Sequence, residues 1–235
     1  VINKVALITD IEEASRQRII AEAKFLRAYA YYDLTALWGN VPFYLHILSG
    51  NDKPAAATPK DTIHNYLVRE LDSIVPYLPE SVPAAQNGRI PKAAAQALLG
   101  KYYLTDGKWA EAATVLNQII KSKRYTLYPD YAGLFTPSGE FSSESLFEIN
   151  FKAQTVDPGE TFSVRIDTLS SPIVPSRLWR PIANLVNSYL AIDGKPISNH
   201  PLYGTKSPLY VSSTPYANRD PRLRANIYTN ADNTP

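Results

Sequence analysis

Residues 93–120 read AAAQALLGKYYLTDGKWAEAATVLNQII, a pattern of small and large apolar residues at steps of three and four. Such steps place residues on one face of a helix, where small side chains let two helices approach closely and large ones fill the space between them. Asp106-Gly107-Lys108 interrupts the pattern and is expected to form a turn. We therefore predict two antiparallel helices over residues 93–121, which come closest at Gly100 and Ala112. The positions that fit this spacing are Leu99, Gly100, Tyr103, Gly107, Trp109, Ala112, Leu116 and Ile119.

This spacing is similar to that of a tetratricopeptide repeat, in which helix pairs stack side by side into a scaffold. Trp109 then occupies a core position of the hairpin and is predicted to be structural. The proline that follows the second helix in such repeats is missing, and Arg124 occupies roughly that place. The stretch therefore predicts a helical scaffold built from hairpins.

Two longer helices are predicted on the N-terminal side of the hairpin. The first covers residues 12–38, ends at Gly39 and carries two apolar sets, so we expect neighbours on two of its sides. The second begins at Thr58-Pro59, where a Thr cap and a Pro in the first turn favour a helix start, and Pro76 is expected to shorten or kink its last turn. In the first helix the stripe expected to face the core is Ile19, Ala23, Leu26, Ala30, Leu34 and Leu37, and the other set is Phe25, Ala28, Tyr32 and Ala36. The stripe of the second helix is Ile63, Leu67, Leu71, Ile74 and Leu78.

The second half of the chain differs in composition. Of the 19 prolines, 12 fall in residues 129–235, and long irregular connections are uncommon in compact domains unless they carry function. We predict a mainly α fold in which residues 1–128 form a tetratricopeptide-like scaffold of helical hairpins. Residues 129–235 are expected to form a loop-rich, Pro- and Tyr-rich region with little sheet, packed on the scaffold within one integrated domain. The ligand-binding part is expected in this second region.

Composition argues against several classes of protein. With 24 basic and 22 acidic residues and no run of five like charges, the chain lacks the basic stripe that nucleic-acid binding needs. It contains no stretch of about 18 apolar residues that could cross a bilayer. The absence of Cys means that neither disulfides nor thiolate metal sites are expected. The absence of Met indicates an internal fragment, or a sequence from which modified methionines are missing.

The sequence also lacks the common motifs of enzymes. His46, His64 and His200 are scattered, and there is no His-Glu-x-x-His, no Gly-x-Ser-x-Gly and no Gly-rich turn after a strand. We therefore expect no catalytic residues, no metal and no cofactor. A carboxylate pair for glycoside hydrolysis stays open as an alternative, because that pairing is spatial and 22 acidic residues offer many combinations. A helical-repeat adaptor that binds another protein in its groove is the other alternative.

Three stretches, in this order, resemble the SusD/RagB family of outer-membrane nutrient-binding lipoproteins. The first is an Arg-Ala-aromatic helix that ends in a Gly-x-Val-Pro turn, the second contains the predicted hairpin, and the third lies in the loop-rich half. Together they extend over most of residues 12–223. The stretches are AEAKFLRAY (21–29) with LWGNVP (37–42); Gly88-Arg89 through the hairpin to Tyr131, Phe135 and ESLFEI (144–149); and Tyr189, DGKPI (193–197) and NRDPRL (218–223).

The resemblance implies a fold and a function. Members of this family resemble tetratricopeptide solenoids that carry an irregular ligand-binding region. They bind an oligosaccharide or another nutrient without cleaving it, at the outer face of a Gram-negative outer membrane, and deliver it to a SusC-like TonB-dependent transporter. They are typically longer than this chain at both ends, so we expect a fragment. Attachment to the membrane is expected only through an N-terminal lipid that this fragment lacks.

Sugar binding is expected to use exposed aromatic rings that stack on a pyranose, with polar groups that fix its hydroxyls. We look for such rings at helix ends and in Pro-rich loops, where packing against the protein is the alternative role for each. For Arg27 and residues 218–222 we favour a structural role, in which arginine side chains pair with carboxylates. The candidate ligand-binding residues are Trp38, Asn40, Trp179, Tyr203, Tyr210 and Tyr216.

Overall fold

The computed structural model describes the whole chain except residues 1, 6, 49–52, 54, 150–180 and 228–235. The chain forms two compact units. The first consists of Val1–Tyr128 and Phe141–Asn150, and the second of Pro129–Glu140 and Phe151–Pro235. In their described parts, the first unit is mostly helical, and the second consists mainly of turns with a few short helices.

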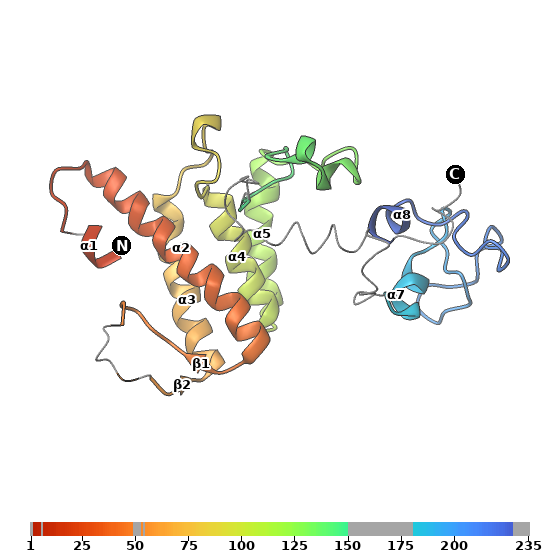
Figure 1. The fold of residues 1–235 in the computed structure, drawn as a ribbon, viewed down its shortest axis with the longest axis horizontal. Helices are drawn as coiled ribbons and strands as arrows, with labels where there is room; N and C mark the ends of the chain where they lie inside the picture. The colour runs from red at the N-terminus through yellow and green to blue at the C-terminus, as the bar shows by residue number, and fades with distance from the viewer. Residues whose placement is uncertain (1, 6, 49–52, 54, 150–180, 228–235) are drawn as a thin grey trace, which may run out of the picture. The chain divides into compact units, whose positions relative to one another are not determined.

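Four helices make up most of the first unit, and Figure 1 shows them side by side. Each packs against the next one in the sequence, as short connections favour. These helices are α2 (Glu13–Trp38), α3 (Lys60–Ile74), α4 (Lys92–Thr105) and α5 (Trp109–Ser122). The shorter elements of this unit are α1 (Ile2–Val5), β1 (Val41–Pro42), β2 (Ala57–Thr58), η1 (Val75–Tyr77) and η2 (Ala84–Gln86). The short helices of the second unit are η3 (Gly133–Phe135), η4 (Pro137–Gly139), α7 (Ala183–Ser188) and α8 (Arg222–Asn226).

The sheet content is small, as predicted. β1 and β2 pair antiparallel, with Val41 opposite Thr58 and Pro42 opposite Ala57. Among the described residues this two-stranded ribbon is the only sheet. The mainly α fold is therefore confirmed.

The core of the first unit lies between α2, α3 and α4. The stripe predicted for α3 is confirmed, since all five of its residues are buried. Pro76 shortens the α-helix as expected, because the chain continues after Ile74 as the 3-10 turn η1. The largest buried side chains of this core are Phe25, Ile63, Leu67, Leu71 and Tyr102.

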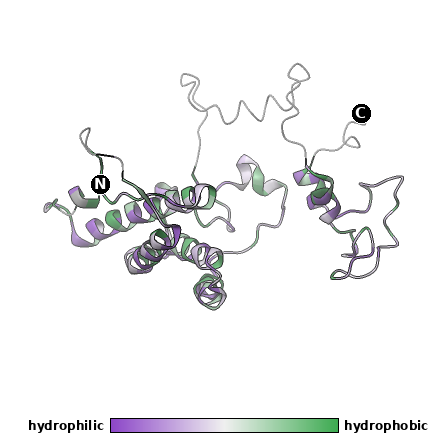
Figure 2. Ribbon diagram, turned by 90° about the horizontal axis from the view of Figure 1, so that it is seen from below, coloured by the Kyte–Doolittle hydropathy of each residue, from purple (hydrophilic) through white to green (hydrophobic). Residues whose placement is uncertain are grey.

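The face that α2 buries differs from the prediction. Leu26, Leu34 and Leu37 of the predicted stripe are exposed, Leu37 to 72%, whereas Phe25 and Ala28 of the other set are buried. Apolar residues occur on both sides of this helix, and Figure 2 shows hydrophobic and hydrophilic patches alternating around the helices of the first unit. Periodicity alone therefore could not predict on which side of α2 the helices α3 and α4 pack. The end of α2 at Gly39 is confirmed.

Helices α4 and α5 confirm the predicted hairpin. Gly107 has a φ of +72°, which lets the chain reverse, and the Lys108 N–H donates to the Tyr103 carbonyl at 2.8 Å. The missing proline is replaced by Lys123, whose left-handed φ of 53° ends α5. The core position predicted for Trp109 is wrong, since this side chain is 67% exposed. Trp109 is the first residue of α5, and the residues that α5 buries lie further along it, at Ala112 and Val115.

The closest approach at Gly100 is also confirmed and supports a stability prediction. A Cβ atom at Gly100 would lie 2.6 Å from Leu116 Cδ2, which is inside van der Waals contact. Gly100→Leu is therefore expected to lower the free energy of unfolding by about 1–3 kcal/mol through overpacking. Urea denaturation followed by circular dichroism measures this change. Ala113→Leu is the matched control, because Ala113 is exposed on α5, and equal losses in the two variants would contradict the packing argument.

Candidate functional site

A groove in the first unit has the size of a small-molecule site. Its volume is about 370 Å³, and ligand pockets commonly measure about 300–1,000 Å³. One wall is the loop before α4 and the other is the chain after α5. The groove is lined by Glu80, Ser81, Val82, Asn87, Gly88, Arg89, Pro91, Arg124, Tyr125, Phe141, Ser145, Leu146, Phe147 and Glu148.

Hydrogen bonds close the loop before α4 at its base and connect it to α2. The Lys92 N–H donates to the Pro79 carbonyl at 2.8 Å, which closes the loop at its base. Arg89 donates to both carboxylate oxygens of Glu22 on α2, at 3.0 and 2.6 Å. Such a forked pair fixes the direction of the guanidinium. This wall of the groove is therefore held at two points.

The opposite wall is folded by local hydrogen bonds. The Tyr128 N–H donates to Glu144 at 2.8 Å, and the Phe141 N–H donates to Glu148 at 2.9 Å. Phe147 anchors this segment to α2, since its ring centroid lies 5.3 Å from that of Phe25. Phe141 has a φ of 54°, a left-handed conformation that is costly for a bulky residue and often occurs at functional sites.

The groove combines aromatic rings with hydrogen-bonding groups. Phe141 and Tyr125 contribute rings, and Asn87 contributes an amide. The neutral Tyr125 hydroxyl can both donate and accept, and burial raises the pKa of this group further above neutral pH. Apolar surface beside a few polar groups is the usual composition of a site for a neutral organic ligand.

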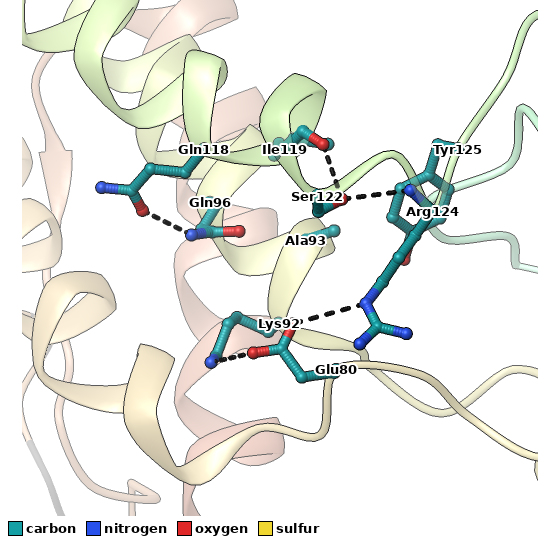
Figure 3. A pocket seen from close by; sticks show the side chains of 9 residues that line it. All are labelled: Glu80, Lys92, Ala93, Gln96, Gln118, Ile119, Ser122, Arg124 and Tyr125. Carbon is teal, nitrogen blue, oxygen red and sulfur yellow. Dashed lines mark hydrogen bonds and ion pairs between the residues drawn. The ribbon is translucent and has the colours of Figure 1, made fainter.

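A smaller pocket of about 250 Å³, the end pocket, adjoins the groove. It lies where α4 begins and α5 ends, and Figure 3 shows its side chains. The two cavities share Glu80, Arg124 and Tyr125. The end pocket and the groove therefore border each other.

The predicted residues of the first unit lie outside both cavities. Trp38 is 65% exposed at the end of α2. Asn40 has a structural contact, because its side-chain oxygen accepts the Lys60 N–H at 3.0 Å at the start of α3. Asn40 thus takes the capping role that was expected of Thr58, which lies in β2 instead.

Three predicted tyrosines lie in the second unit. The ring of Tyr203 is exposed and lies 4.6 Å from that of His200, in a tight reversal closed by two hydrogen bonds between His200 and Gly204. Tyr210 and Tyr216 are half-buried, and Lys206 Nζ lies 5.2 Å from the Tyr210 ring centre. Trp179 lies outside the described residues. Two of the six candidates thus lie in the first unit and three in the second.

The structural role expected of these arginines is confirmed, but only Arg27 and Arg222 pair with carboxylates, whereas Arg219 binds backbone carbonyls. Arg27 pairs with both carboxylate oxygens of Glu70 on α3. Arg219 is buried and donates to the carbonyls of Pro215, Val186 and Tyr189 at 2.7–2.9 Å. Arg222 pairs with Asp220, and its hydrogen bond lowers the pKa of that carboxyl group. These contacts tie the chain together in both units.

One cluster has the order of contacts of a catalytic triad but lies in the core. His64 Nε2 is 2.9 Å from Thr35 Oγ1, and His64 Nδ1 is 2.6 Å from Asp106 Oδ1. Thr35 and His64 are each only 1% exposed, and the Thr35 hydroxyl also contacts the Tyr31 carbonyl at 2.7 Å. A substrate has no access to this hydroxyl. The cluster therefore connects α2, α3 and the α4–α5 turn.

Among the described residues, no group of three or more His, Cys, Asp or Glu is placed to hold a metal ion. Within the same part of the chain, no helix is both long enough and apolar enough to span a membrane.

The groove residues were not predicted as site residues. Gly88-Arg89 and residues 144–149 stood out only as parts of the family resemblance. Tyr125 and Phe141 are 16 positions apart and carry no motif, so the pairing of the two walls is visible only in three dimensions.

The chain is similar in sequence and fold to several known proteins. No family model matches the sequence. SusD-like protein P25 of Formosa agariphila is 28% identical over 172 residues, which are 73% of this chain and 33% of that protein. A SusD-like carbohydrate-binding protein from Bacteroides fragilis has a TM-score of 0.74 at 28% identity, over 96% of this chain and 43% of its own.

A third similar protein is surface glycan-binding protein A from Bacteroides thetaiotaomicron, solved in complex with laminarihexaose. It is 28% identical with a TM-score of 0.56, over 64% of this chain and 32% of its own. The chain therefore spans about a third to less than half of the length of the proteins that it matches.

Proposed function

Since this chain belongs to the SusD-like family, we propose that the full-length protein binds an oligosaccharide without cleaving it. The observation that carries the proposal is the groove, where aromatic rings and hydrogen-bonding side chains line one cavity. The similar protein from Bacteroides fragilis is described as carbohydrate-binding, and surface glycan-binding protein A was solved with laminarihexaose. Both descriptions support a glycan as the ligand.

The chemistry of the groove suits a sugar. The two faces of a pyranose differ from its edge, since C–H groups on a face pack against an aromatic ring while hydroxyls at the edge need donors and acceptors. We assign the stacking role to Phe141, and the hydroxyls of the sugar to Asn87 and the Tyr125 hydroxyl. Stacking then supplies affinity, and the hydrogen bonds select the sugar.

Phe141→Ala tests this assignment. A ring at a binding hot spot contributes about 2 kcal/mol or more, so we expect affinity to fall about thirtyfold. A glycan array on the full-length protein first identifies a ligand, and isothermal titration calorimetry then measures the dissociation constant. The melting temperature should not fall, because the Phe141 ring is exposed and its removal leaves no cavity in the core.

The matched control is Phe135→Ala, which removes another exposed ring that does not line the groove. Equal affinities of wild type and Phe141→Ala would contradict the groove as the site. Alanine variants of Trp38, Asn40, Trp179, Tyr203, Tyr210 and Tyr216 belong in the same series, because these residues stay predicted ligand contacts. A thirtyfold loss at one of them, with none at Phe141, would move the site there.

The absence of cleavage is part of the proposal. Of the two carboxylates that line the groove, Glu80 pairs with Lys92 at an exposed position and Glu148 accepts the Phe141 N–H. Incubating the full-length protein with its ligand should produce no new reducing ends. Turnover above background would favour a glycoside hydrolase instead. Binding of a protein and of no glycan would favour a helical-repeat adaptor.

We extend the proposal to location and partner on the strength of the family alone. The full-length protein is proposed to sit on the outer face of a Gram-negative outer membrane through an N-terminal lipid, and to pass its ligand to a SusC-like TonB-dependent transporter. Fractionation of cell membranes tests the location. Co-purification with a transporter from the same membranes tests the partner.

A further inference from the structure

The end pocket has a charged side and a neutral polar side (Figure 3). Lys92, Glu80 and Arg124 lie on one side, and Gln96 and Gln118 lie on the other. Ala93 and Ile119 contribute small and apolar surface. The pocket therefore offers apolar contact, neutral hydrogen bonding and charge within about 250 Å³.

The charged side holds a carboxylate between two cations. Lys92 Nζ pairs with one oxygen of Glu80, and Arg124 Nε lies 3.7 Å from the other oxygen. In the described part of the chain neither cation pairs with a second acidic side chain, so this cluster has a net positive charge. The hydrogen bond from Lys92 lowers the pKa of Glu80, so its carboxyl group is charged at neutral pH.

The carboxylate of Glu80 is poorly confined. Its side chain is 51% exposed, so water reaches it and the group can rotate away at little cost. An external carboxylate that enters the pocket meets the same two cations. Lys92 and Arg124 are thus placed so that one carboxylate can contact both of them.

The neutral side has hydrogen-bonding capacity left over. Gln96 is only 8% exposed, and its amide N–H donates to the Gln118 side-chain oxygen at 2.6 Å. This bond leaves the Gln96 oxygen as an acceptor and the Gln118 N–H₂ group as a donor, neither with a hydrogen bond to another described residue. Two such groups can hold two neighbouring hydroxyls of one sugar ring.

We propose that the end pocket binds a sugar unit that carries a carboxylate, a uronic acid, within the oligosaccharide held in the groove. The sugar carboxylate takes the place of Glu80 between Lys92 and Arg124, and its hydroxyls meet Gln96 and Gln118. The inference rests on the proposed function, because the end pocket adjoins the groove through Glu80, Arg124 and Tyr125. It narrows the ligand to acidic glycans.

Glu80→Gln separates this role from that of a neutral sugar site. If Glu80 competes with the ligand, its neutralisation frees both cations, and the affinity for a uronic acid rises. If Glu80 instead accepts a sugar hydroxyl, the same change weakens binding. Charged hydrogen bonds contribute about 1.5–3 kcal/mol, so we expect Lys92→Gln to weaken binding of the uronic acid at least about tenfold.

The experiment uses the full-length protein with glucuronic acid, glucose and sodium acetate as probes, titrated by ligand-observed NMR. We expect glucuronic acid to bind at least about tenfold tighter than glucose or acetate. Added salt should weaken the binding of glucuronic acid but not that of glucose. Glu80→Gln should tighten its binding and Lys92→Gln should weaken it. Lys121→Gln is the control, since it removes one exposed charge on α5 outside the pocket.

Two results with the wild-type protein would overturn the inference: glucose, or acetate, binding as tightly as glucuronic acid. Two results with variants would also overturn it: weaker binding of glucuronic acid by Glu80→Gln, or the same loss of affinity in Lys121→Gln as in Lys92→Gln. A neutral oligosaccharide that binds the groove while glucuronic acid does not bind would overturn it and leave the proposed function intact. Failure of every glycan on an array would overturn both. Thermal melts confirm that each variant is folded.

Discussion

Replacing Tyr102 with alanine is expected to lower the free energy of unfolding of the helical unit by about 3–5 kcal/mol. Tyr102 lies on α4 with none of its surface exposed, and its ring contacts those of Tyr32 and His64 edge-on, at centroid distances of 5.2 and 4.8 Å. Removing the ring leaves a cavity bordered by three helices, which cannot collapse without moving one of them. Urea denaturation monitored by circular dichroism measures the loss.

Two further variants test whether the buried Tyr102 ring is the source of this stability. Tyr102→Phe keeps the ring and loses only the hydrogen bond to the Ala28 carbonyl, so we expect a cost of about 0.5–1.5 kcal/mol, because this carbonyl lies within α2 and keeps its helical hydrogen bond. Trp109→Ala removes a larger but exposed ring and should change stability by less than about 1 kcal/mol. A greater loss for Trp109→Ala than for Tyr102→Ala would contradict the position of the core.

Arg27→Met is expected to lower the free energy of unfolding by about 3 kcal/mol. The Glu70 carboxylate on α3 is buried, and Arg27 of α2 binds both of its oxygens. Methionine keeps the apolar stem but leaves this carboxylate with Lys24, whose Nζ lies 3.9 Å away, as its remaining cation. Removing one partner of a buried ion pair destabilises the fold by more than the intact pair contributed, because the remaining carboxylate keeps only this longer contact.

The double variant Arg27→Met, Glu70→Met separates charge from packing. It removes the pair entirely, and replacing a buried ion pair with apolar groups of similar size is often neutral. We therefore expect the double variant to recover most of the stability that Arg27→Met loses in urea denaturation. If it is as unstable as the single variant, the loss at Arg27 came from packing and not from the buried charge.

Much of the structure of the first unit could be predicted from the sequence, but little of the candidate site could. The hairpin could be predicted because Gly100 and Ala112 are small residues where two helices come close. Gly107 is a flexible residue where the chain must turn. The buried face of α2 was not, because apolar residues line both of its sides and only the position of α3 and α4 distinguishes them. Arg27 could be expected to meet a carboxylate, but Glu70 could not be chosen among 22 acidic residues.

The candidate site shows the same limit. Exposed rings can be proposed from their place at a helix end, as Trp38 was, or in a loop, as Tyr203 was, and both are exposed. A cavity depends instead on which segments face each other. The groove forms because the loop around Asn87 and the segment around Phe141 return to the same end of the α4–α5 hairpin, and no local pattern encodes that meeting.

The contact between Asp106 and His64 sets where the chain can accept extra residues. Tight turns between helices usually tolerate insertions, since their side chains point into water. At this turn the Asp106 carboxylate reaches into the core and meets His64 Nδ1 at 2.6 Å. A loop inserted there would pull the carboxylate away and leave a buried ring nitrogen without its partner. The exposed residues 84–88 carry no comparable tie in the described structure, so length variation in a scaffold of this kind belongs at that loop and not at the hairpin turn.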